Sequence, residues 1–244
     1  MRAKVAGGLA LSLLQTRYEI ETPKGPIAFA LLGLGSAKRS GMLLVKQPET
    51  IAWIDSFRPD SVFWDIGANI GIYALYAALR GDVQVVAFEP AAVNYFLLAA
   101  NCELNHFDDR MNCFLLGLGE GRGVARLEVS QFEPASSFSF RGKPREPRTG
   151  RQTSLILSID QVVEEFGVPC PTYIKIDVPD LSEAILRGGA RTLPRPEVRD
   201  IHIEAGDDPG SDQRIAALLD HYGFGVARRH ERAVATDLTF TKRT

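Results

Sequence analysis

The sequence predicts an α/β fold whose core is a doubly wound, mostly parallel sheet. Short continuous apolar segments alternate with segments of helical apolar spacing from about residue 60 onward. This alternation is typical of strands that are covered by helices on both faces. The first apolar segment runs through FWDIGANIGIY, residues 63–73, into a tight turn and then a helix. The next one, VVAFEP, ends in the acid Glu89 and its proline.

The sequence predicts that residues 1–58 form an N-terminal extension, which caps the substrate side of this core. MRAKVAGGLALSLL has basic residues and then an apolar run too short to span a bilayer, with no small-x-small cleavage site after it, so we expect a retained helix. YEIETPKGPIAFALL alternates polar and apolar residues around a Pro-Lys-Gly-Pro turn and predicts a hairpin. PETIAWIDSF has apolar residues at helical spacing and predicts a short helix.

The sequence predicts that residues 59–244 form the core. A chain of 244 residues suits one large α/β domain and leaves little room for a second core. The expected strands are SVFWDIG (61–67), VQVVAFEP (83–90), MNCFLLGLG (111–119), GVARLEVS (123–130), LILS (155–158), TYIKIDV (172–178), DIHIEAG (200–206) and DLTFTK (237–242). The expected helices are GIYALYAALR (71–80), AAVNYFLLAANCELN (91–105), IDQVVEEFG (159–167), LSEAILRGGARTL (181–193) and SDQRIAALLDHYGF (211–224). In the second of these helices, Phe96, Ala99, Ala100 and Leu104 fall on one side.

One long irregular segment, residues 131–153, interrupts this pattern. Its aromatic and basic residues are Phe132, Phe138, Phe140, Arg141, Lys143, Arg145, Arg148 and Arg151. One interpretation is a lid that binds an anionic or sugar substrate through guanidinium groups and aromatic faces. The other interpretation is a solvated, flexible loop. Both stay open at the level of the sequence.

Composition and charge narrow the range of partners. Lys and Arg total 28 and Asp and Glu total 30, so the net charge is −2 and no global field attracts nucleic acid or an acidic membrane. Cys102, Cys113 and Cys170 form no CxxC pair, which argues against a disulfide framework or a zinc site. We therefore expect a cytoplasmic protein without nucleic-acid partners and without a stable membrane span.

The turn at 65–71 favours a nucleoside ligand that has no pyrophosphate. Dinucleotide folds use G-x-G-x-x-G, whose middle glycine lets the backbone touch the pyrophosphate. Here Asn69 takes that middle place between Gly67 and Gly71, which argues against NAD or FAD. Glu89, at the end of the next strand, suits two ribose hydroxyls. S-adenosylmethionine meets both conditions, and Asp65 adds negative charge near its cationic end.

Four blocks in this order resemble FkbM-type S-adenosylmethionine-dependent methyltransferases: DIGANIGIYALYAA, VVAFEP with NYFLLAANCELN, YIKIDV, and ILRGG. They cover roughly residues 20–205. The resemblance implies a class I, Rossmann-like sheet of seven strands whose last strand is antiparallel. It also implies O-methylation of a hydroxyl on a small molecule, a sugar or a glycan-like acceptor.

The resemblance also implies a set of cofactor-binding residues. Carried over by motif, they are Asp65, Gly67, Asn69, Gly71, Glu89, Asn94, Gly117 and Leu118. The first four would line the methionine part of the cofactor, and Glu89 would hold the ribose. Asn94 would support that loop, and Gly117 and Leu118 would face the adenine.

The chain departs from the family after its YIKIDV strand. The family continues as Lys-Ile-Asp-Val-Glu-Gly-x-Glu, whereas this chain has KIDVPDLSE. Pro179 and Asp180 replace the Glu-Gly pair, and Ser182 stands where the second Glu is expected. Glu183 is displaced by one position, which rotates a helical side chain by about 100°. The departure implies a different acceptor or a loss of activity.

Three residues at the carboxyl ends of central strands are candidates for a catalytic role. Asp177 is the first choice for the base that takes the hydroxyl proton, Glu204 is the second, and His202 lies two residues before it. Alternatively, Asp177 contacts the cofactor or caps the next helix. The alternative for His202 is a structural role in the core. A divalent ion held by Asp177, Glu204 and Asp180 is conceivable, but the sequence shows no dedicated cage, so we expect no metal.

The sequence leaves three candidate functions for this protein. The first is an O-methyltransferase that acts on a small-molecule or carbohydrate acceptor. The second is a catalytically impaired methyltransferase-like binding module, motivated by the altered VPDLSE segment. The third, an NAD-dependent oxidoreductase, is disfavoured by Asn69.

Overall fold

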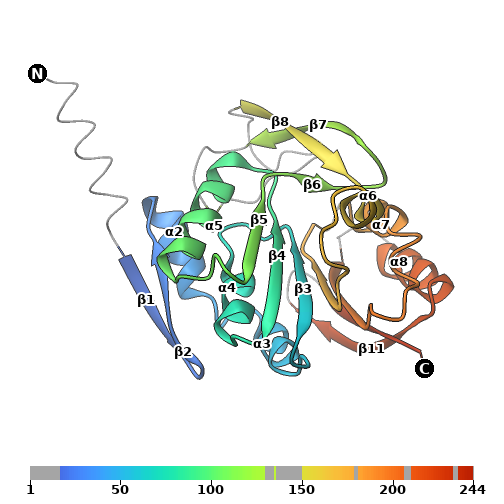
Figure 1. Ribbon diagram of the computed structural model, residues 1–244, viewed down its shortest axis with the longest axis horizontal. Coiled ribbons are helices and arrows are strands. Elements are labelled where there is room, and N and C mark those ends of the chain that lie inside the picture. The colour runs from blue at the N-terminus through green and yellow to red at the C-terminus, as the bar shows by residue number, and fades with distance from the viewer. Residues whose placement is uncertain are drawn as a thin grey trace, which may run out of the picture.

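The computed structural model describes residues 17–129, 135, 150–178, 181–205, 210–232 and 236–243. Over these residues the chain forms one large sheet with helices on both of its faces (Figure 1). Its seven strands, in the order in which they lie side by side, are β11 (Phe224–Glu231), β12 (Thr236–Lys242), β10 (Asp200–Ala205), β9 (Tyr173–Ile176), β3 (Ser61–Ile66), β4 (Val83–Phe88) and β5 (Met111–Phe114).

The strand directions confirm the predicted α/β class and the mostly parallel sheet. Strands β5, β4, β3, β9 and β10 are mutually parallel, and β12 is antiparallel to both of its neighbours, β10 and β11. The strand order reverses between β3 and β9, because β3, β4 and β5 extend to one edge and the later strands extend to the other. In open α/β sheets the ligand crevice forms at this switch point, outside the carboxyl ends of the strands.

Three strands end at the same level on either side of the switch point. Ile66, the last residue of β3, lies in register with Phe88 of β4 and with Ile176 of β9. The residues that follow them, Gly67, Glu89 and Asp177, therefore leave the sheet together. This register is what brings sequence-distant candidate residues to one place.

Helices cover each face of the sheet with its own apolar core. One core contains residues of α3 (Pro48–Asp55), α4 (Ile72–Leu79) and α5 (Ala92–Leu104), and the other contains residues of α6 (Ile159–Glu164), α7 (Ser182–Arg187) and α8 (Ser211–His221). Successive residues of a central strand, such as Phe63 and Trp64, belong to different cores. Both are fully buried, as expected for strands with helices on both sides.

The N-terminal extension contains the predicted hairpin and short helix. Strands β1 (Arg17–Thr22) and β2 (Gly25–Ala30) pair antiparallel, and α2 (Gly33–Gly41) and α3 follow. The hairpin is attached to α5 by two asparagine side chains. Asn101 Oδ1 accepts from the Ala30 N–H at 2.7 Å, and Asn105 Oδ1 accepts from the Ala28 N–H at 2.8 Å. Asn101 also donates to the carbonyl of Ile70 at 2.8 Å, so one side chain joins the hairpin to the turn at 65–71.

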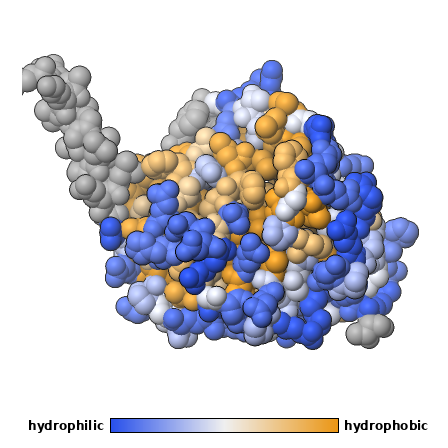
Figure 2. Space-filling view, viewed as in Figure 1, coloured by the Kyte–Doolittle hydropathy of each residue, from blue (hydrophilic) through white to orange (hydrophobic). Residues whose placement is uncertain are grey.

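The buried side of α5 differs from the apolar side that the sequence shows. The helix buries Asn94, Leu97, Leu98, Asn101 and Cys102, whereas Phe96 is 46% exposed. Asn94 and Asn101 are buried because their amide groups make hydrogen bonds that an apolar side chain could not make. The side of the helix that carries them faces the core, and Phe96 lies on the other side. Figure 2 shows the resulting apolar surface over α5 and β5.

Three strands of the structure differ from the sequence prediction. One of them, β8 (Gly150–Leu157), begins at Gly150, so residues 150–153 belong to a strand and not to the irregular segment predicted at 131–153. MNCFLLGLG divides into β5 and a second short strand, β6 (Gly117–Leu118), which joins β8 and β7 (Gly123–Val129) in a three-stranded sheet. Strand β11 was not predicted. It has exposed charged residues and lies at the edge of the main sheet, with β12 inside it.

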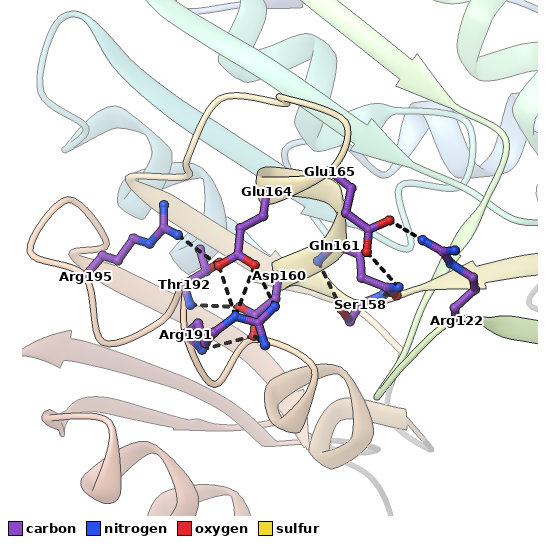
Figure 3. Close-up of polar contacts among 9 residues, drawn as sticks. All are labelled: Arg122, Ser158, Asp160, Gln161, Glu164, Glu165, Arg191, Thr192 and Arg195. Atoms are coloured by element: carbon purple, nitrogen blue, oxygen red, sulfur yellow. Dashed lines mark hydrogen bonds and ion pairs between the residues drawn. The ribbon is translucent and has the colours of Figure 1, made fainter.

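Helix α7 is shorter than predicted because α6 fixes the residues that follow it (Figure 3). Asp160 is buried and accepts from the N–H groups of Arg191 and Thr192, at 3.0 Å and 2.8 Å. The Arg191 guanidinium also pairs with Glu164 at 2.6 Å. These contacts hold a turn where the sequence pattern predicts a continued helix.

Candidate active site

The turn after β3 approaches β9 so closely that only glycine fits at position 67. Gly67 has φ of 82°, and a Cβ there would lie 2.8 Å from the carbonyl oxygen of Asp177. Gly71 has φ of 89°, and a Cβ there would lie 2.6 Å from Leu98. Both conditions, positive φ and close approach, exclude a side chain. The main chain thus makes the tight turn that the sequence predicts at 65–71.

Asn69 adopts a left-handed conformation at the tip of this turn. Its φ is 56°, and its Oδ1 accepts from the Ile70 N–H at 3.0 Å. Asparagine tolerates this conformation better than other residues that carry a Cβ. The Asn69 N–H then donates to Glu89 Oε2 at 2.8 Å, which connects the first turn to the end of the second strand.

Glu89 is buried and held by backbone donors from two loops. Its Oε1 accepts from the Ala91 N–H at 2.8 Å, and its Oε2 accepts from Asn69. Burial raises the pKa of Glu89 to about 7, although these two hydrogen bonds act in the opposite direction. The Asn94 side chain also forms a hydrogen bond with this carboxylate. Because a carboxylate offers about four acceptor sites, these three donors leave room for a further hydrogen bond from a ligand hydroxyl.

Asp65 is buried, and a weak contact with the Ala74 N–H helps to stabilise its charge. The residue is 1% exposed, and neither of its carboxylate oxygens accepts a well-formed hydrogen bond from any residue that the structure describes. Its nearest cation is Lys175, whose Nζ lies 3.9 Å from Asp65 Oδ1. Burial raises the pKa of Asp65 to about 6, and the charge of Lys175 opposes this. A buried acid with free acceptors is costly alone and suits a cationic ligand.

Lys175 forms a close ion pair with Asp177. Its Nζ lies 3.0 Å from Asp177 Oδ2 and 4.9 Å from the centre of the Tyr73 ring, and the residue is 2% exposed. Burial acts to raise the pKa of Asp177, but the charges of Lys175, Lys46 and Arg39 outweigh it and hold this pKa well below its usual range. Asp177 is therefore ionised at neutral pH.

Glu204 is paired beneath the N-terminal extension. Its Oε2 accepts from Arg232 Nη2 at 2.5 Å and from Gln47 Nε2 at 3.1 Å. Arg232 also lies 2.7 Å from Asp237. The carboxylate is thus shared between the sheet and the segment before α3, so the extension lies over the carboxyl end of β10.

His202 lies in the packing between β10 and α3. Its Nε2 is 3.1 Å from Thr50 Oγ1, its Nδ1 is 2.9 Å from Thr239 Oγ1, and its ring stacks on Trp53 at 5.0 Å between centroids. Burial lowers the pKa of His202 to about 3. Both ring nitrogens are occupied and the ring is neutral, which matches the core role that the sequence left open for it.

The remaining predicted cofactor residues lie beyond Glu89. Asn94 is buried, and its Oδ1 accepts from the Ala135 N–H at 2.8 Å. Gly117 and Leu118 form β6, shortly after the end of β5, and both are buried. Asn94 thus lies in the first turn of the helix that follows β4, and β6 follows β5.

Several predicted features lie outside the described residues. These are the N-terminal helix, Pro179 and Asp180, the three phenylalanines of the 131–153 segment, and Arg141, Lys143, Arg145 and Arg148. Arg151 is described and lies 3.9 Å from Glu128. Among the described residues there is no group of three or more His, Cys, Asp or Glu placed to hold a metal ion. No helix in the described part of the chain has the length and apolar character needed to cross a membrane.

Sequence reasoning missed Lys175, Tyr73, Arg39 and Lys46. The signal for Lys175 is present in YIKIDV, where a charged residue interrupts a buried apolar strand. Such a lysine requires a partner, and Asp177 is its nearest acid in sequence. Tyr73, Arg39 and Lys46 leave no comparable signal, because their roles depend on how the extension and α4 meet the sheet.

The strand order with its antiparallel β12, the glycine turn after β3 and the buried acid after β4 define the fold of class I methyltransferases. The family model described as the methyltransferase FkbM domain matches residues 65–226. The chain belongs to the FkbM methyltransferase family.

Two relatives and two solved structures show the range of this similarity. The hexuronic acid methyltransferase AglP of Haloferax volcanii is 30% identical over 156 residues, which are 64% of this chain and 61% of AglP. The 31-O-demethyl-FK506 methyltransferase FkbM of Streptomyces tacrolimicus is 28% identical, over 71% of this chain and 76% of that protein. This chain thus spans less than two thirds of AglP.

The solved structures share the fold at much lower identity. The precorrin-6y C5,15-methyltransferase of Geobacter metallireducens has a TM-score of 0.52 at 13% identity, over 83% of this chain and 91% of that one. M. capricolum TrmK, solved with S-adenosyl-homocysteine, has a TM-score of 0.51 at 8% identity, over 80% and 68%. At these identities the likeness concerns the fold alone.

Proposed function

We propose that this protein transfers a methyl group from S-adenosylmethionine to a hydroxyl of a small-molecule or sugar-like acceptor. The observation that carries the proposal is the arrangement of three carboxylates around the Gly67 turn: Asp65 and Glu89, which are buried, and Asp177, which is partly exposed. They arise from three strands that end in register.

The described residues fit this cofactor at both of its ends. Glu89 keeps acceptor capacity for a ribose hydroxyl, and the Asp65 oxygens, which accept no well-formed hydrogen bond from the described residues, suit the cationic methionine end. Gly67, Asn69 and Gly71 would let the main chain approach the methionine part. Asn94, Gly117 and Leu118 would continue the site toward the adenine. When bound, the cofactor supplies an electrophilic methyl group on a sulfonium.

On the acceptor side, we assign to Asp177 the role of binding the acceptor hydroxyl and taking its proton. Its side chain is 12% exposed and is ionised beside Lys175. An ionised carboxylate accepts a hydrogen bond from the hydroxyl and aligns its oxygen for in-line attack. Because Lys175 makes Asp177 a weak base, the proton moves to Asp177 late, after the oxygen has begun to bond to carbon. Glu204, held by Arg232 and Gln47, borders this space from β10.

The names of the relatives support an oxygen acceptor. One relative acts on a hexuronic acid, and the name of the other refers to a 31-O-demethyl substrate. Because this chain spans only 61% of the first relative, the acceptor class belongs to the proposal.

Calorimetry with S-adenosyl-homocysteine and NAD tests the cofactor, and transfer of a labelled methyl group to a panel of hydroxylated compounds tests the reaction. We expect binding of the first ligand only, and transfer to at least one hydroxyl. NAD binding, or no binding of S-adenosyl-homocysteine, would contradict the proposal. Tight binding without transfer to any acceptor would favour the binding module instead.

A further inference from the structure

Two cations of the N-terminal extension, Arg39 and Lys46, face the site without a carboxylate partner. Arg39 lies on α2, and Lys46 lies in the segment that leads to α3. Arg39 Nη1 donates to the Ala135 carbonyl at 3.4 Å, and its Nε is buried with no partner among the described residues. Gln47, next to Lys46, donates to Glu204. These contacts place both cationic residues above the ends of the strands.

Three acids of the site have a cation closer than Arg39 or Lys46: Asp65 and Asp177 share Lys175, and Glu204 is paired with Arg232. Lys175 lies 3.0 Å from Asp177 and 3.9 Å from Asp65. Arg232 lies 2.5 Å from Glu204 and 2.7 Å from Asp237. Within the described residues, no carboxylate oxygen lies within 4.0 Å of the charged groups of Arg39 or Lys46, so neither cation has a close ion pair of its own.

Both cations act on the proposed acceptor position. Both lower the pKa of Asp177, after the larger effects of burial and of Lys175. Burial lowers the pKa of Lys46 itself, and the charge of Asp177 opposes this. A partly buried cation without a partner is unfavourable, and an anionic ligand would relieve that cost.

We propose that the methyl acceptor is an anion, a hydroxylated compound whose acidic group is bound by Arg39 and Lys46 while its hydroxyl faces Asp177. This inference rests on the proposed methyl transfer and adds the substrate class. Arg39 would supply a planar set of donors for the acidic group, and Lys46 would supply a point charge. The separate ion pairs of Lys175 and Arg232 explain why the site acids would not compete for these two cations.

The cofactor also has a carboxylate, and the test must separate it from the acceptor. Glucuronate, glucose 6-phosphate and glucose differ at one carbon, and D-lactate offers a smaller hydroxy acid. Each is titrated by calorimetry into the protein saturated with S-adenosyl-homocysteine, and each is also offered as a methyl acceptor. We expect at least one anion to bind about tenfold or more tightly than glucose. The relative strength of the carboxylates and the phosphate then identifies the acidic group.

Substitutions at Arg39 and Lys46 test whether these two residues bind the anion. Arg39→Gln and Lys46→Gln should each weaken binding of the preferred anion by about 10- to 100-fold and leave glucose and S-adenosyl-homocysteine unchanged. Lys38→Gln is the matched control, because Lys38 is exposed on the same helix. Melting curves of all three variants verify folding.

Three results would overturn the proposal. They are the absence of binding by every anion tested, equal losses for anion and glucose in the variants, and weakened binding of S-adenosyl-homocysteine with the anion unaffected. The last result would assign the two cations to the cofactor carboxylate. Failure of the unmodified protein to bind S-adenosyl-homocysteine would instead contradict the proposed methyl transfer itself.

Discussion

Lys175 Nζ lies 3.0 Å from Asp177 Oδ2 and joins the residue assigned to the acceptor to Asp65, the acid assigned to the cofactor, at 3.9 Å. Both distances belong to a lysine that is 2% exposed. The two halves of the site therefore share one buried charge, and a change in that charge should affect both.

Replacing Lys175 by Met should impair both stability and turnover. Breaking a buried ion pair by removal of one partner costs about 3–5 kcal/mol. Loss of the positive charge should also raise the pKa of Asp177, so the acid limb of the kcat profile should move to higher pH. Denaturant unfolding and the pH dependence of kcat measure the two effects. An unchanged acid limb in a folded variant would show that Asp177 does not control turnover.

Gly67→Ala should abolish cofactor binding and destabilise the fold. The Cβ would meet the Asp177 carbonyl oxygen at 2.8 Å in a backbone conformation with φ of 82°. Strained conformations of this kind cost about 1–3 kcal/mol each. Gly121→Ala is the matched control, since a Cβ there meets nothing within 4 Å. Equal stability of the two variants would show that the turn can move away from β9.

Binding of S-adenosyl-homocysteine should weaken as the pH falls through about 7, the raised pKa of Glu89. Protonation replaces one acceptor with a donor and removes the charge that binds the ribose hydroxyls. Glu89→Gln should bind more weakly at high pH and lose most of this dependence. Calorimetry between pH 5.5 and 8.5 measures both proteins, and parallel profiles would remove the ribose assignment.

The raised pKa of Glu89 also has a consequence for stability without cofactor. Between its ordinary value of 4.5 and about 7, the folded state holds a proton that the unfolded state releases. This contribution to the free energy of unfolding therefore falls as the pH rises through that interval. In Glu89→Gln it should disappear, which unfolding at a series of pH values would show.

His202→Gln should reduce stability far more than catalysis. The side chain satisfies Thr50 and Thr239 and stacks on Trp53, and buried groups left without partners cost about 1–3 kcal/mol each. Because burial lowers the pKa of His202 to about 3, its stabilising contribution is complete above about 6.5 and is lost as the pH falls toward 3. A folded variant with kcat reduced about a hundredfold would instead support a catalytic role.

The central part of the fold could be predicted because its residues obey one local rule. SVFWDIG, VVAFEP and YIKIDV are apolar through their length except where a charge is placed at the site. Strand β11 could not be predicted in this way, since FGVARRHE is charged and mostly exposed and is ordered by pairing with β12.

The residues of the candidate site also fall into two groups, those that local sequence predicts and those that depend on tertiary contacts. Gly67, Asn69 and Glu89 were predicted from local spacing, because a turn of this kind needs particular residue types. Arg39 and Lys46 were not, since their approach to Asp177 depends on contacts between the extension and distant strands.

Asn101 carries a consequence for how this chain can diversify. Its amide spans from the hairpin backbone at Ala30 to the carbonyl of Ile70, directly beside the tip of the glycine turn. A change in the hairpin backbone would therefore shift Ile70, which lies in the turn assigned to the cofactor. Under the proposed function, we therefore expect substitutions in the hairpin to change cofactor affinity together with acceptor choice.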